Sequence, residues 1–324
     1  MTTVLVSATY MQPHLRRFMP VFERLGITLI VPEVFERLEE EDLLPYAGQF
    51  DGVICGDDRF SARVLQASLP RLKAISKWGT GIDSIDSEAA ARLGISVYRT
   101  PNAFTLPVSD TVLGYILTFA RRLPWMDDQM KAGNWEKIPG RALHECTLGV
   151  VGVGNIGKMV LRKAQAFGMR LLGNDIVEID PAFVRETGVQ MLPLPELLAQ
   201  SDFISLNCDL NPTSRHLMNE ETFSMVKSGA VLVNTSRGPV VDEAAMVRAL
   251  QYGQISGAGL DVFEFEPLPA ESPLRAMDQV LLAPHNSNSS PFAWEHVHRN
   301  TLKNLLEGLG FTTSQIQEAM ESLR

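Results

Sequence analysis

A glycine-rich segment in the middle of the chain constrains the fold more than any other feature. Residues 147–151 are mostly apolar and predict a short buried strand, which leads into Gly152, Gly154 and Gly157 and a helical pattern over 156–167. A strand, Gly-x-Gly-x-x-Gly and a helix in this order form the context in which the motif binds a dinucleotide. The glycines permit the tight turn, the approach of a pyrophosphate and close helix packing, while N–H groups at the helix start face the phosphates. We therefore predict an α/β dinucleotide-binding domain.

An acidic residue downstream indicates which dinucleotide binds. Residues 170–174 predict the next strand, and Asp175 follows it, close to the spacing of about 20 residues expected for an acid that binds the ribose. A carboxylate at that place accepts hydrogen bonds from the ribose hydroxyls and repels a 2′-phosphate. Residues 176–178 supply no lysine or arginine to neutralise a phosphate. NAD is therefore expected rather than NADP.

Short β-rich runs alternate with helix-like stretches in both halves of the chain, a pattern typical of parallel α/β sheets. The second series follows a long amphipathic segment at 107–123, which we expect to be a helix joining two domains. Helical stretches at 291–309 and 312–323 are expected to return to the first domain. The predicted strands are 4–6, 28–31, 52–55, 72–76 and 96–98 in the first series, and 147–151, 170–174, 203–206, 230–234, 255–260 and 280–283 in the second.

These patterns predict an α/β protein of two Rossmann-like or flavodoxin-like parallel-sheet domains with a cleft between them. We expect a discontinuous substrate domain over residues 1–100 plus 287–324, and an NAD-binding Rossmann domain over residues 101–286. The 324 residues, 45% of them hydrophobic, are enough to bury two cores.

Three residues beyond the glycine loop suggest hydride-transfer chemistry: Arg237, Glu266 and His285. Interconversion of a 2-hydroxy acid and a 2-keto acid needs a fixed cation for the carboxylate and carbonyl oxygens, and the planar fork of arginine suits both. It also needs a group that takes and gives a proton near neutral pH, as histidine does. A carboxylate beside that ring fixes its tautomer and favours the imidazolium.

The same residues are expected to gather at one edge of a sheet. Arg237 and His285 come just after the fourth and sixth strands of the second series, and Asp261 directly follows the fifth. Because ligands of open parallel sheets bind at the carboxyl ends of the strands, these side chains should face the cofactor loop.

Charge and composition exclude several other classes of protein. The net charge is −9, and no run of lysine or arginine exceeds two residues, so neither nucleic acid nor an anionic membrane is an expected partner. The first residues lack a signal-peptide pattern and no apolar run is long enough to span a bilayer, so we expect a cytoplasmic protein. Cys55, Cys146 and Cys208 are odd in number and far apart, which predicts reduced thiols and no metal site.

With these motifs in view, the chain resembles the D-2-hydroxyacid dehydrogenases, and within that family it is most similar to the phosphoglycerate dehydrogenases. The similarity covers almost the whole chain. Its long motifs are Ser-Asp-Phe-Ile-Ser-Leu at 201–206, Gly-Ala-Val-Leu-Val-Asn-Thr-Ser-Arg-Gly at 229–238, Gly-Leu-Asp-Val-Phe at 259–263 and Lys-Trp-Gly-Thr-Gly-Ile-Asp at 77–83.

The resemblance implies a role for individual residues. It makes His285 the acid/base, Glu266 rather than Glu264 its carboxylate partner, because the family's glutamate precedes a proline, and Arg237 a substrate ligand. It implies cofactor contacts from Asn155, Ile156, Cys208, Thr235, Asp261 and Thr100, in addition to the glycines and Asp175, and substrate contacts from Lys77, Gly79, Thr80, Gly81 and Asn102.

Some features leave alternatives open. Asn286–Ser290 departs from the usual family sequence after the histidine, so the substrate pocket can differ. The chain ends near residue 324, and the regulatory domain of longer family members is not expected. An NAD-sensing corepressor of the same fold would keep the same three residues, and a formate-dehydrogenase-like activity would leave Lys77 without a role.

Lys77 and two pairs of other residues each have a functional and an ordinary interpretation. Lys77 could bind a second anionic group, in which case dianionic substrates such as phosphohydroxypyruvate or oxaloacetate are preferred, or it could be a solvated lysine at a strand end. His296 and His298 point to different sides of a helix, which favours a solvated face over a metal site. Trp125 and Trp135 bracket either a surface segment or a homodimer contact, since family members are commonly dimers.

Overall fold

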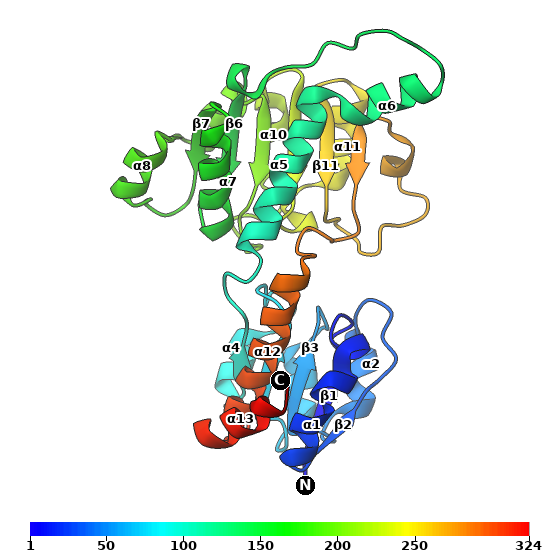
Figure 1. Ribbon diagram of the computed structural model, residues 1–324, viewed down its shortest axis with the longest axis vertical. Coiled ribbons are helices and arrows are strands. Elements are labelled where there is room, and N and C mark those ends of the chain that lie inside the picture. The colour runs from blue at the N-terminus through cyan, green and yellow to red at the C-terminus, as the bar shows by residue number, and fades with distance from the viewer. Residues whose placement is uncertain (324) are drawn as a thin grey trace. The chain divides into compact units, whose positions relative to one another are not determined.

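The computed structural model describes residues 1–323, which form two compact units (Figure 1). The terminal unit consists of Met1–Ala103 together with the chain from Ser290 onward, and the central unit is Phe104–Ser289. We had expected the chain to pass between domains at 100 and 286, a few residues before these positions.

The terminal unit is built on a five-stranded parallel sheet in the order β2-β1-β3-β4-β5, the flavodoxin-like order. Helix α12 from the end of the chain packs on β3 and β4, where Ser76 Oγ donates to the carbonyl of Thr301 at 2.8 Å. The strands are β1 Thr2–Val6, β2 Ile27–Ile30, β3 Gly52–Cys55, β4 Ala74–Lys77 and β5 Ser96–Tyr98, and the helices are α1 Leu15–Arg24, α2 Glu40–Leu43, α3 Ala62–Ala67, α4 Ser87–Arg92, α12 Pro291–Gly308 and α13 Thr313–Met320.

The central unit holds a seven-stranded parallel sheet in the order β12-β11-β10-β9-β6-β7-β8. When β6 is counted as the first strand, the order is 3-2-1-4-5-6, as in dinucleotide-binding sheets, and β12 is added as a seventh strand beside the sixth. The six predicted strands are all present. The one strand that was not predicted, β8, is too short to show a periodic pattern. The strands are β6 Thr147–Val151, β7 Arg170–Asn174, β8 Gln190–Met191, β9 Phe203–Leu206, β10 Ala230–Asn234, β11 Ile255–Leu260 and β12 Val280–Leu282.

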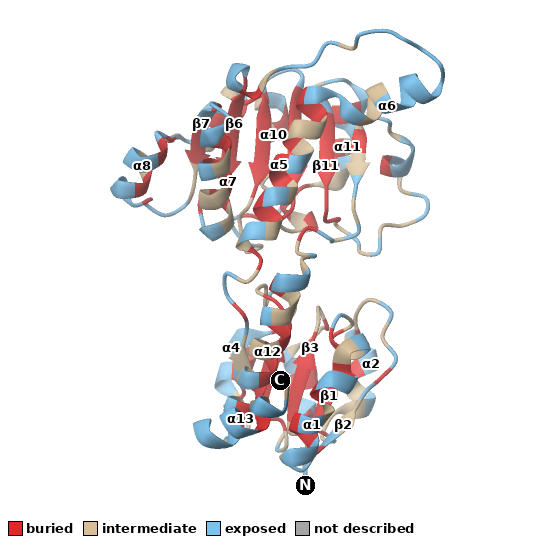
Figure 2. Ribbon diagram, viewed as in Figure 1, coloured by how far each residue is buried: buried red, intermediate tan, exposed pale blue. Residues whose placement is uncertain are grey.

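Helices cover both faces of the central sheet. Alternate residues of one strand enter different cores: Leu232 packs with the cluster under α9, α10 and α11, while Val231 and Val233 pack with the cluster under α5, α7 and α8. Figure 2 shows the strands buried and the outer helix faces exposed. The helices are α5 Thr105–Arg121, α6 Leu123–Lys131, α7 Asn155–Ala166, α8 Pro181–Thr187, α9 Leu194–Gln200, α10 Glu220–Met225 and α11 Glu243–Gln251.

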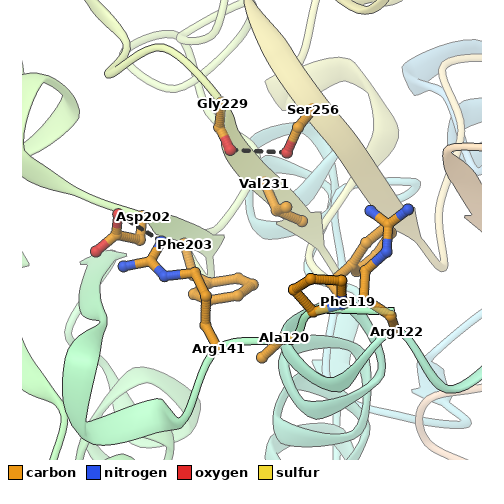
Figure 3. Close-up of a pocket in the computed structure, with 11 residues that line it drawn as sticks. Phe119, Ala120, Arg122, Arg141, Asp202, Phe203, Gly229, Val231 and Ser256 are labelled. Atoms are coloured by element: carbon orange, nitrogen blue, oxygen red, sulfur yellow. Dashed lines mark hydrogen bonds and ion pairs between the residues drawn. The ribbon is translucent and has the colours of Figure 1, made fainter. Parts of the chain in front are cut away.

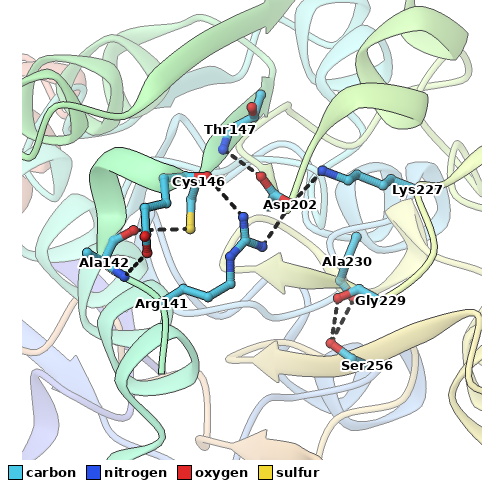
Figure 4. A network of polar contacts seen from close by, with 10 residues as sticks. Arg141, Ala142, Cys146, Thr147, Asp202, Lys227, Gly229, Ala230 and Ser256 are labelled. Atoms are coloured by element: carbon cyan, nitrogen blue, oxygen red, sulfur yellow. Dashed lines mark hydrogen bonds and ion pairs between the residues drawn. The ribbon is translucent and has the colours of Figure 1, made fainter. Parts of the chain in front are cut away.

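The amino-terminal edge of the central sheet carries a buried ion cluster. Asp202, just before β9, is 6% exposed and accepts hydrogen bonds from Arg141, Lys227 and the Thr147 backbone N–H at 2.7–2.9 Å (Figure 4). Burial raises the pKa of this carboxyl, but the three donors outweigh burial and hold the pKa at about 2. The cluster joins the starts of neighbouring elements and so supports the sheet at the edge away from the glycine loop.

A cavity of about 200 Å³ lies at the same amino-terminal edge, lined by Arg122, Arg141 and Phe203 among others (Figure 3). The glycine loop follows the carboxyl end of β6 and therefore lies at the opposite edge. This cavity is consequently not part of the predicted site. Among the residues that the structure describes, no helix has the length and apolar character needed to cross a bilayer.

Candidate active site

The glycine loop between β6 and α7 has the backbone geometry that its sequence predicts. Gly152 has φ +88°, and a Cβ added there would lie 2.5 Å from the backbone nitrogen of Cys208. A Cβ at Gly157 would lie 2.1 Å from the carbonyl oxygen of Gly152, whereas one at Gly154 would meet no atom within 4 Å. The first and third glycines thus allow close packing, and the second leaves open space beside the start of α7 where a pyrophosphate can approach.

The loop lies where the strand order of the sheet reverses. β6 pairs with β7 on one side and β9 on the other, and the chain leaves the sheet after β6 and β9 on the same edge. Asn207 and Cys208 follow β9 and so stand beside Gly152. Burial raises the pKa of the Cys208 thiol to about 11, which keeps it protonated and unsuited to be a nucleophile. Such a reversal point is where dinucleotides bind in open parallel sheets.

Asp175 stands at the end of β7 with its carboxylate directed to the glycine loop. Its Oδ2 accepts a hydrogen bond from the Val153 backbone N–H at 2.7 Å, and its Oδ1 accepts from Val177 N–H at 3.1 Å. These bonds fix the carboxylate beside the loop and leave lone pairs on both oxygens. A ribose contact by Asp175 remains a prediction that this position favours.

Two buried polar atoms at this edge suit a dinucleotide. Thr235 Oγ1 and Asn207 Oδ1 are both buried, and neither has a hydrogen-bond partner among the described residues. Buried polar atoms normally have a partner, so atoms of this kind mark places that a polar ligand can satisfy. Together with the open space at Gly154, these residues fit the nicotinamide and ribose groups of NAD.

Arg237 is held by a turn that Asn234 organises. Asn234 is 1% exposed at the end of β10, and its Oδ1 accepts from the backbone and hydroxyl of Ser236 at 3.0 and 2.8 Å. Its Nδ2 donates to the Arg237 carbonyl at 3.0 Å, and one guanidinium nitrogen of Arg237 donates to the Ser236 carbonyl at 2.8 Å. The sequence motif over 229–238 contains Asn234 without indicating its role, although an asparagine at the end of a strand is a signal for such a turn.

Gly238 brings the Arg237 turn against the segment that follows β11. A Cβ at Gly238 would lie 1.8 Å from the carbonyl oxygen of Phe263 and 2.5 Å from the nitrogen of Glu264. Only glycine permits this approach of two backbones. The position of Arg237 is therefore tied to the turn that carries Glu266.

Glu266 and His285 form a hydrogen-bonded pair. Glu266 Oε2 lies 3.0 Å from His285 Nδ1, and Oε1 accepts from the Phe263 backbone N–H at 2.9 Å. Both side chains are about one-fifth to one-quarter exposed. An ionised carboxylate only accepts hydrogen bonds, so the pairing places the proton on Nδ1 and makes Nε2 the ring nitrogen suited to proton exchange with a ligand.

Asp261 positions the backbone around His285. Its buried carboxylate accepts from the N–H groups of Asn286 and Ser287 at 2.7–3.1 Å, and its carbonyl accepts from His285 N–H at 2.8 Å. His285 itself has φ +49°. The contact with nicotinamide implied for Asp261 stays a prediction, because the carboxylate oxygens already bind the loop.

Lys77 differs from one of its two interpretations. It is 3% exposed at the end of β4, and its Nζ donates to Asp57 Oδ1 at 2.7 Å. The interpretation as a solvated lysine is therefore wrong. The alternative, a cation that binds a substrate, stays a prediction; the ammonium is paired with Asp57 within the terminal unit.

The loop after Lys77 has a fixed backbone. Gly79 has φ +124°, and its carbonyl accepts from Thr100 N–H at 2.8 Å, while Thr80 Oγ1 donates to the Thr100 carbonyl at 2.9 Å. Thr100 is 1% exposed, and its hydroxyl accepts from Asn300 at 3.0 Å, so a direct cofactor contact from Thr100 stays a prediction. Gly81 is half-buried, and Asn102 is exposed with φ +63°.

A scan of protein-family models identifies the central unit. Residues 113–287 match the model described as D-isomer specific 2-hydroxyacid dehydrogenase, NAD binding domain. The chain belongs to this family. As a D-2-hydroxyacid dehydrogenase, it is an NAD-dependent oxidoreductase, and NAD is its cofactor.

Curated relatives of this dehydrogenase carry more than one name. A glyoxylate reductase of Korarchaeum cryptofilum is 40% identical over 72% of this chain and 71% of the relative, and one of Thermococcus onnurineus is 37% identical over 85% of both. A human D-3-phosphoglycerate dehydrogenase is 39% identical over 77% of this chain. The match spans about half of that relative, 47% of its length.

Solved structures of similar proteins cover nearly the whole dehydrogenase. A D-lactate dehydrogenase of Aquifex aeolicus, complexed with NAD and lactic acid, has a TM-score of 0.85 at 28% identity, covering 99% of this chain and 97% of that one. The TT0316 protein of Thermus thermophilus has a TM-score of 0.83 at 34% identity, covering 95% and 97%. The two-domain fold expected from the sequence is thereby confirmed.

Two expectations outside the site need correction or remain open. The solvated face expected for His298 is wrong: the ring is 2% exposed and accepts from Trp78 Nε1 at 2.9 Å, and burial, aided by His14, lowers its pKa to about 4. No group of three or more potential ligands among the described residues could hold a metal ion. Trp125 Nε1 donates to the Asp278 carbonyl at 3.2 Å, while Trp135 is 87% exposed.

Proposed function

We propose that this dehydrogenase interconverts a small D-2-hydroxy acid and its 2-keto acid, with His285 as the acid/base. The observation that carries the proposal is the Glu266–His285 pair, which lies at the same sheet edge as the glycine loop and is tied through Gly238 to the Arg237 turn. A proton donor, a fixed cation and a dinucleotide loop at one edge are the parts that keto-acid reduction requires.

The proton chemistry follows from the tautomer. When NADH is bound, it supplies a hydride to C2 of the keto acid. His285 Nε2–H donates its proton to the carbonyl oxygen, so the product is a hydroxyl group and the ring becomes neutral. Glu266, hydrogen-bonded at Nδ1, stabilises the imidazolium that this step consumes and holds the ring in orientation. In oxidation His285 Nε2 accepts the same proton.

The cation of Arg237 and the backbone loop at 79–81 are the groups that would orient the substrate. We propose that Arg237 binds the carboxylate and the keto oxygen with its planar fork. Backbone N–H groups of Gly79, Thr80 and Gly81 are proposed to bind the carboxylate as well, supported by the loop fixed through Thr100. Asn102 is proposed as a further substrate contact.

The favoured substrate is a small monoanionic 2-keto acid of the glyoxylate class. The pairing of Lys77 with Asp57 offsets the charge on which a preference for dianions would depend, which supports a monoanion. The glyoxylate reductases also match over most of both chains, whereas the human phosphoglycerate dehydrogenase matches over half of its own length. Phosphohydroxypyruvate remains the second candidate, because the identity to that relative is equally high.

NADH oxidation measured across glyoxylate, pyruvate, hydroxypyruvate, oxaloacetate, 2-ketoglutarate and phosphohydroxypyruvate tests this proposal. We expect the highest kcat/KM with a small monoanion, and we expect His285→Ala to reduce turnover to near background. An absence of turnover with all six keto acids would contradict the proposed reaction. It would favour the alternative of an NAD-sensing corepressor. NAD affinity, measured by calorimetry, separates a cofactor-binding protein without activity from one that is misfolded.

We also propose a homodimer that works in the cytoplasm. Exposed apolar side chains on α6 and beyond support the dimer: Leu123 and Met130 are each 51% exposed and Trp135 is 87% exposed. Three free cysteines support a reducing compartment. Light scattering of the wild type and of Trp135→Asp tests the dimer. A wild type with the mass of a monomer, and a variant of the same mass, would contradict it. Cell fractionation tests the location.

A further inference from the structure

A second histidine–glutamate pair involves the segment after β11 that also carries Glu266. His216 Nε2 lies 2.7 Å from Glu264 Oε1, and the two side chains are 40% and 23% exposed. Glu264 precedes Glu266 by two residues in the segment after β11. No part of the proposed reaction uses this pair.

Glu264 is also joined to the start of α11 by reciprocal hydrogen bonds. Its Oε2 accepts from the Glu243 backbone N–H at 3.3 Å, and its own N–H donates to Glu243 Oε2 at 3.2 Å. Burial, with the nearby charge of Glu264 as a further contribution, raises the pKa of Glu243. Each carboxylate thus accepts from the backbone N–H of the other residue, and the His216 ring is hydrogen-bonded to Glu264.

The backbone of His216 is fixed against the Arg237 loop. Its N–H donates to the carbonyl of Pro239 at 2.8 Å, and its carbonyl accepts from Asn219 Nδ2 at 3.0 Å. The residue has φ +50°. Pro239 follows Gly238, which packs directly on the peptide between Phe263 and Glu264. One continuous set of contacts therefore runs from His216 through Glu264 to the turn and to the Arg237 loop.

We infer that His216 is a positioning residue, which through Glu264 holds the turn that places Glu266 on His285. The inference rests on the proposed function of Glu266 and His285 and adds a part to it. Phe263 N–H, a donor to Glu266, lies in the peptide next to the Glu264 anchor, so a loosened anchor moves the carboxylate as well. At His285, the Glu266 carboxylate is hydrogen-bonded to the ring and the Asp261 carbonyl accepts from the backbone N–H.

The test compares His216→Leu, which removes the donor, with His216→Gln, which restores an N–H near the place of Nε2. We expect His216→Leu to lower kcat by roughly 5- to 30-fold, less than the full effect of one charge-assisted hydrogen bond because His216 acts through Glu264, with NAD affinity within about twofold of wild type. His216→Gln should recover most of the loss. His144→Ala, at an exposed histidine of the same unit, is the matched control and should change nothing.

A double-substitution cycle separates positioning from general destabilisation. In the Glu266→Gln background, His216→Leu should have an effect below about twofold, because the carboxylate that it positions is gone. An equal loss in both backgrounds would overturn the inference. If His216→Leu fails to fold, Glu264→Gln takes its place, and the same non-additivity is expected.

A spectroscopic measurement makes the outcome independent of turnover. Nitrogen-15 chemical shifts of the six histidines, with His285 assigned by its loss in His285→Ala, report the fraction of its neutral form protonated at Nδ1. We expect this fraction to fall in His216→Leu and to recover in His216→Gln. An unchanged tautomer in His216→Leu refutes the positioning role even if the wild type reduces no keto acid, whereas an absence of turnover with a changed tautomer refutes only the proposed reaction.

Discussion

Glu266 binds two donors at once: Oε2 lies 3.0 Å from His285 Nδ1, and Oε1 accepts from the Phe263 backbone N–H at 2.9 Å. The backbone bond fixes the carboxylate in the turn, and the other oxygen is therefore aimed at the ring. His285 is held from its own side by the Asp261 carbonyl. A pair anchored on both sides can keep one tautomer throughout a catalytic cycle.

Replacing the carboxylate should shift the pH profile of keto-acid reduction. The reaction consumes the imidazolium form of His285, and the carboxylate favours that form. Without its charge, the ring loses its proton at lower pH, so Glu266→Gln should move the alkaline limb of kcat/KM to lower pH. His285→Ala should nearly abolish turnover. A profile of Glu266→Gln that overlays the wild type would show that the pair has no part in catalysis.

Asp175→Ala should weaken NAD binding and narrow the preference for NAD over NADP. The substitution removes the proposed ribose hydrogen bonds and also relieves repulsion of a 2′-phosphate. One charge-assisted bond corresponds to roughly 10- to 150-fold in affinity. Kinetics with both cofactors measure the ratio. Glu178→Ala, at an exposed acid in the same segment, is the control for loss of charge alone, and an unchanged ratio in Asp175→Ala would place the ribose elsewhere.

Gly238→Ala should damage both stability and catalysis. Its Cβ would overlap the Phe263 carbonyl at 1.8 Å, so one of two backbones has to move. We expect a loss of about 1–3 kcal/mol in the free energy of unfolding and a fall in kcat/KM beyond that of stability alone. Gly114→Ala is the matched control: no atom lies within 4 Å of the added Cβ in α5, and alanine there should be neutral or stabilising. Denaturant unfolding and kinetics of both variants decide the matter.

Asp202 should give the protein a stability that disappears in acid. Its folded pKa of about 2 lies below the usual value of 3.8, so the contribution is present above pH 3.8 and is lost as the pH falls through 2. The size is on the order of 1–2 kcal/mol, because the half-exposed side chains of Arg141 and Lys227 are screened by solvent. The stability difference between wild type and Asp202→Asn should therefore shrink from about pH 4 to pH 2. Asp128→Asn on α6 is the exposed control, and a difference that stays constant with pH would mean that Asp202 is not ionised in the cluster.

Lys77→Met should lower kcat/KM by a similar factor for all substrates. Because the ammonium is paired with Asp57, its loss removes a buried cation from this ion pair and disturbs the loop at Gly79, whatever the charge of the substrate. The measurement is kcat/KM for glyoxylate and phosphohydroxypyruvate, together with the melting temperature. Lys73→Met, an exposed lysine just before β4, is the control. A loss confined to the dianion would instead support the original expectation of a second anion at Lys77.

The sequence alone determined the bounds of five strands of the central sheet and the glycine loop. β6, β7, β9, β10 and β11 begin and end at the predicted residues, because buried parallel strands are short apolar runs bounded by turn residues. The requirement for glycine at 152 and 157 is equally local, since it arises where one strand turns into one helix. β8 was not predicted, because a strand of two residues is too short to show an alternation of apolar and polar side chains.

Only the tertiary structure decided which charged groups meet. His216 and Glu264 are separated by 48 residues, and Lys77 and Asp57 by 20, and nothing in either segment names its partner. Burial of His298 likewise depends on Trp78, which is 220 residues away in the sequence. Such pairs depend on which strands are neighbours and how far each loop extends beyond its strand. The residue types at the site can therefore be predicted from local sequence, whereas their pairing requires the fold.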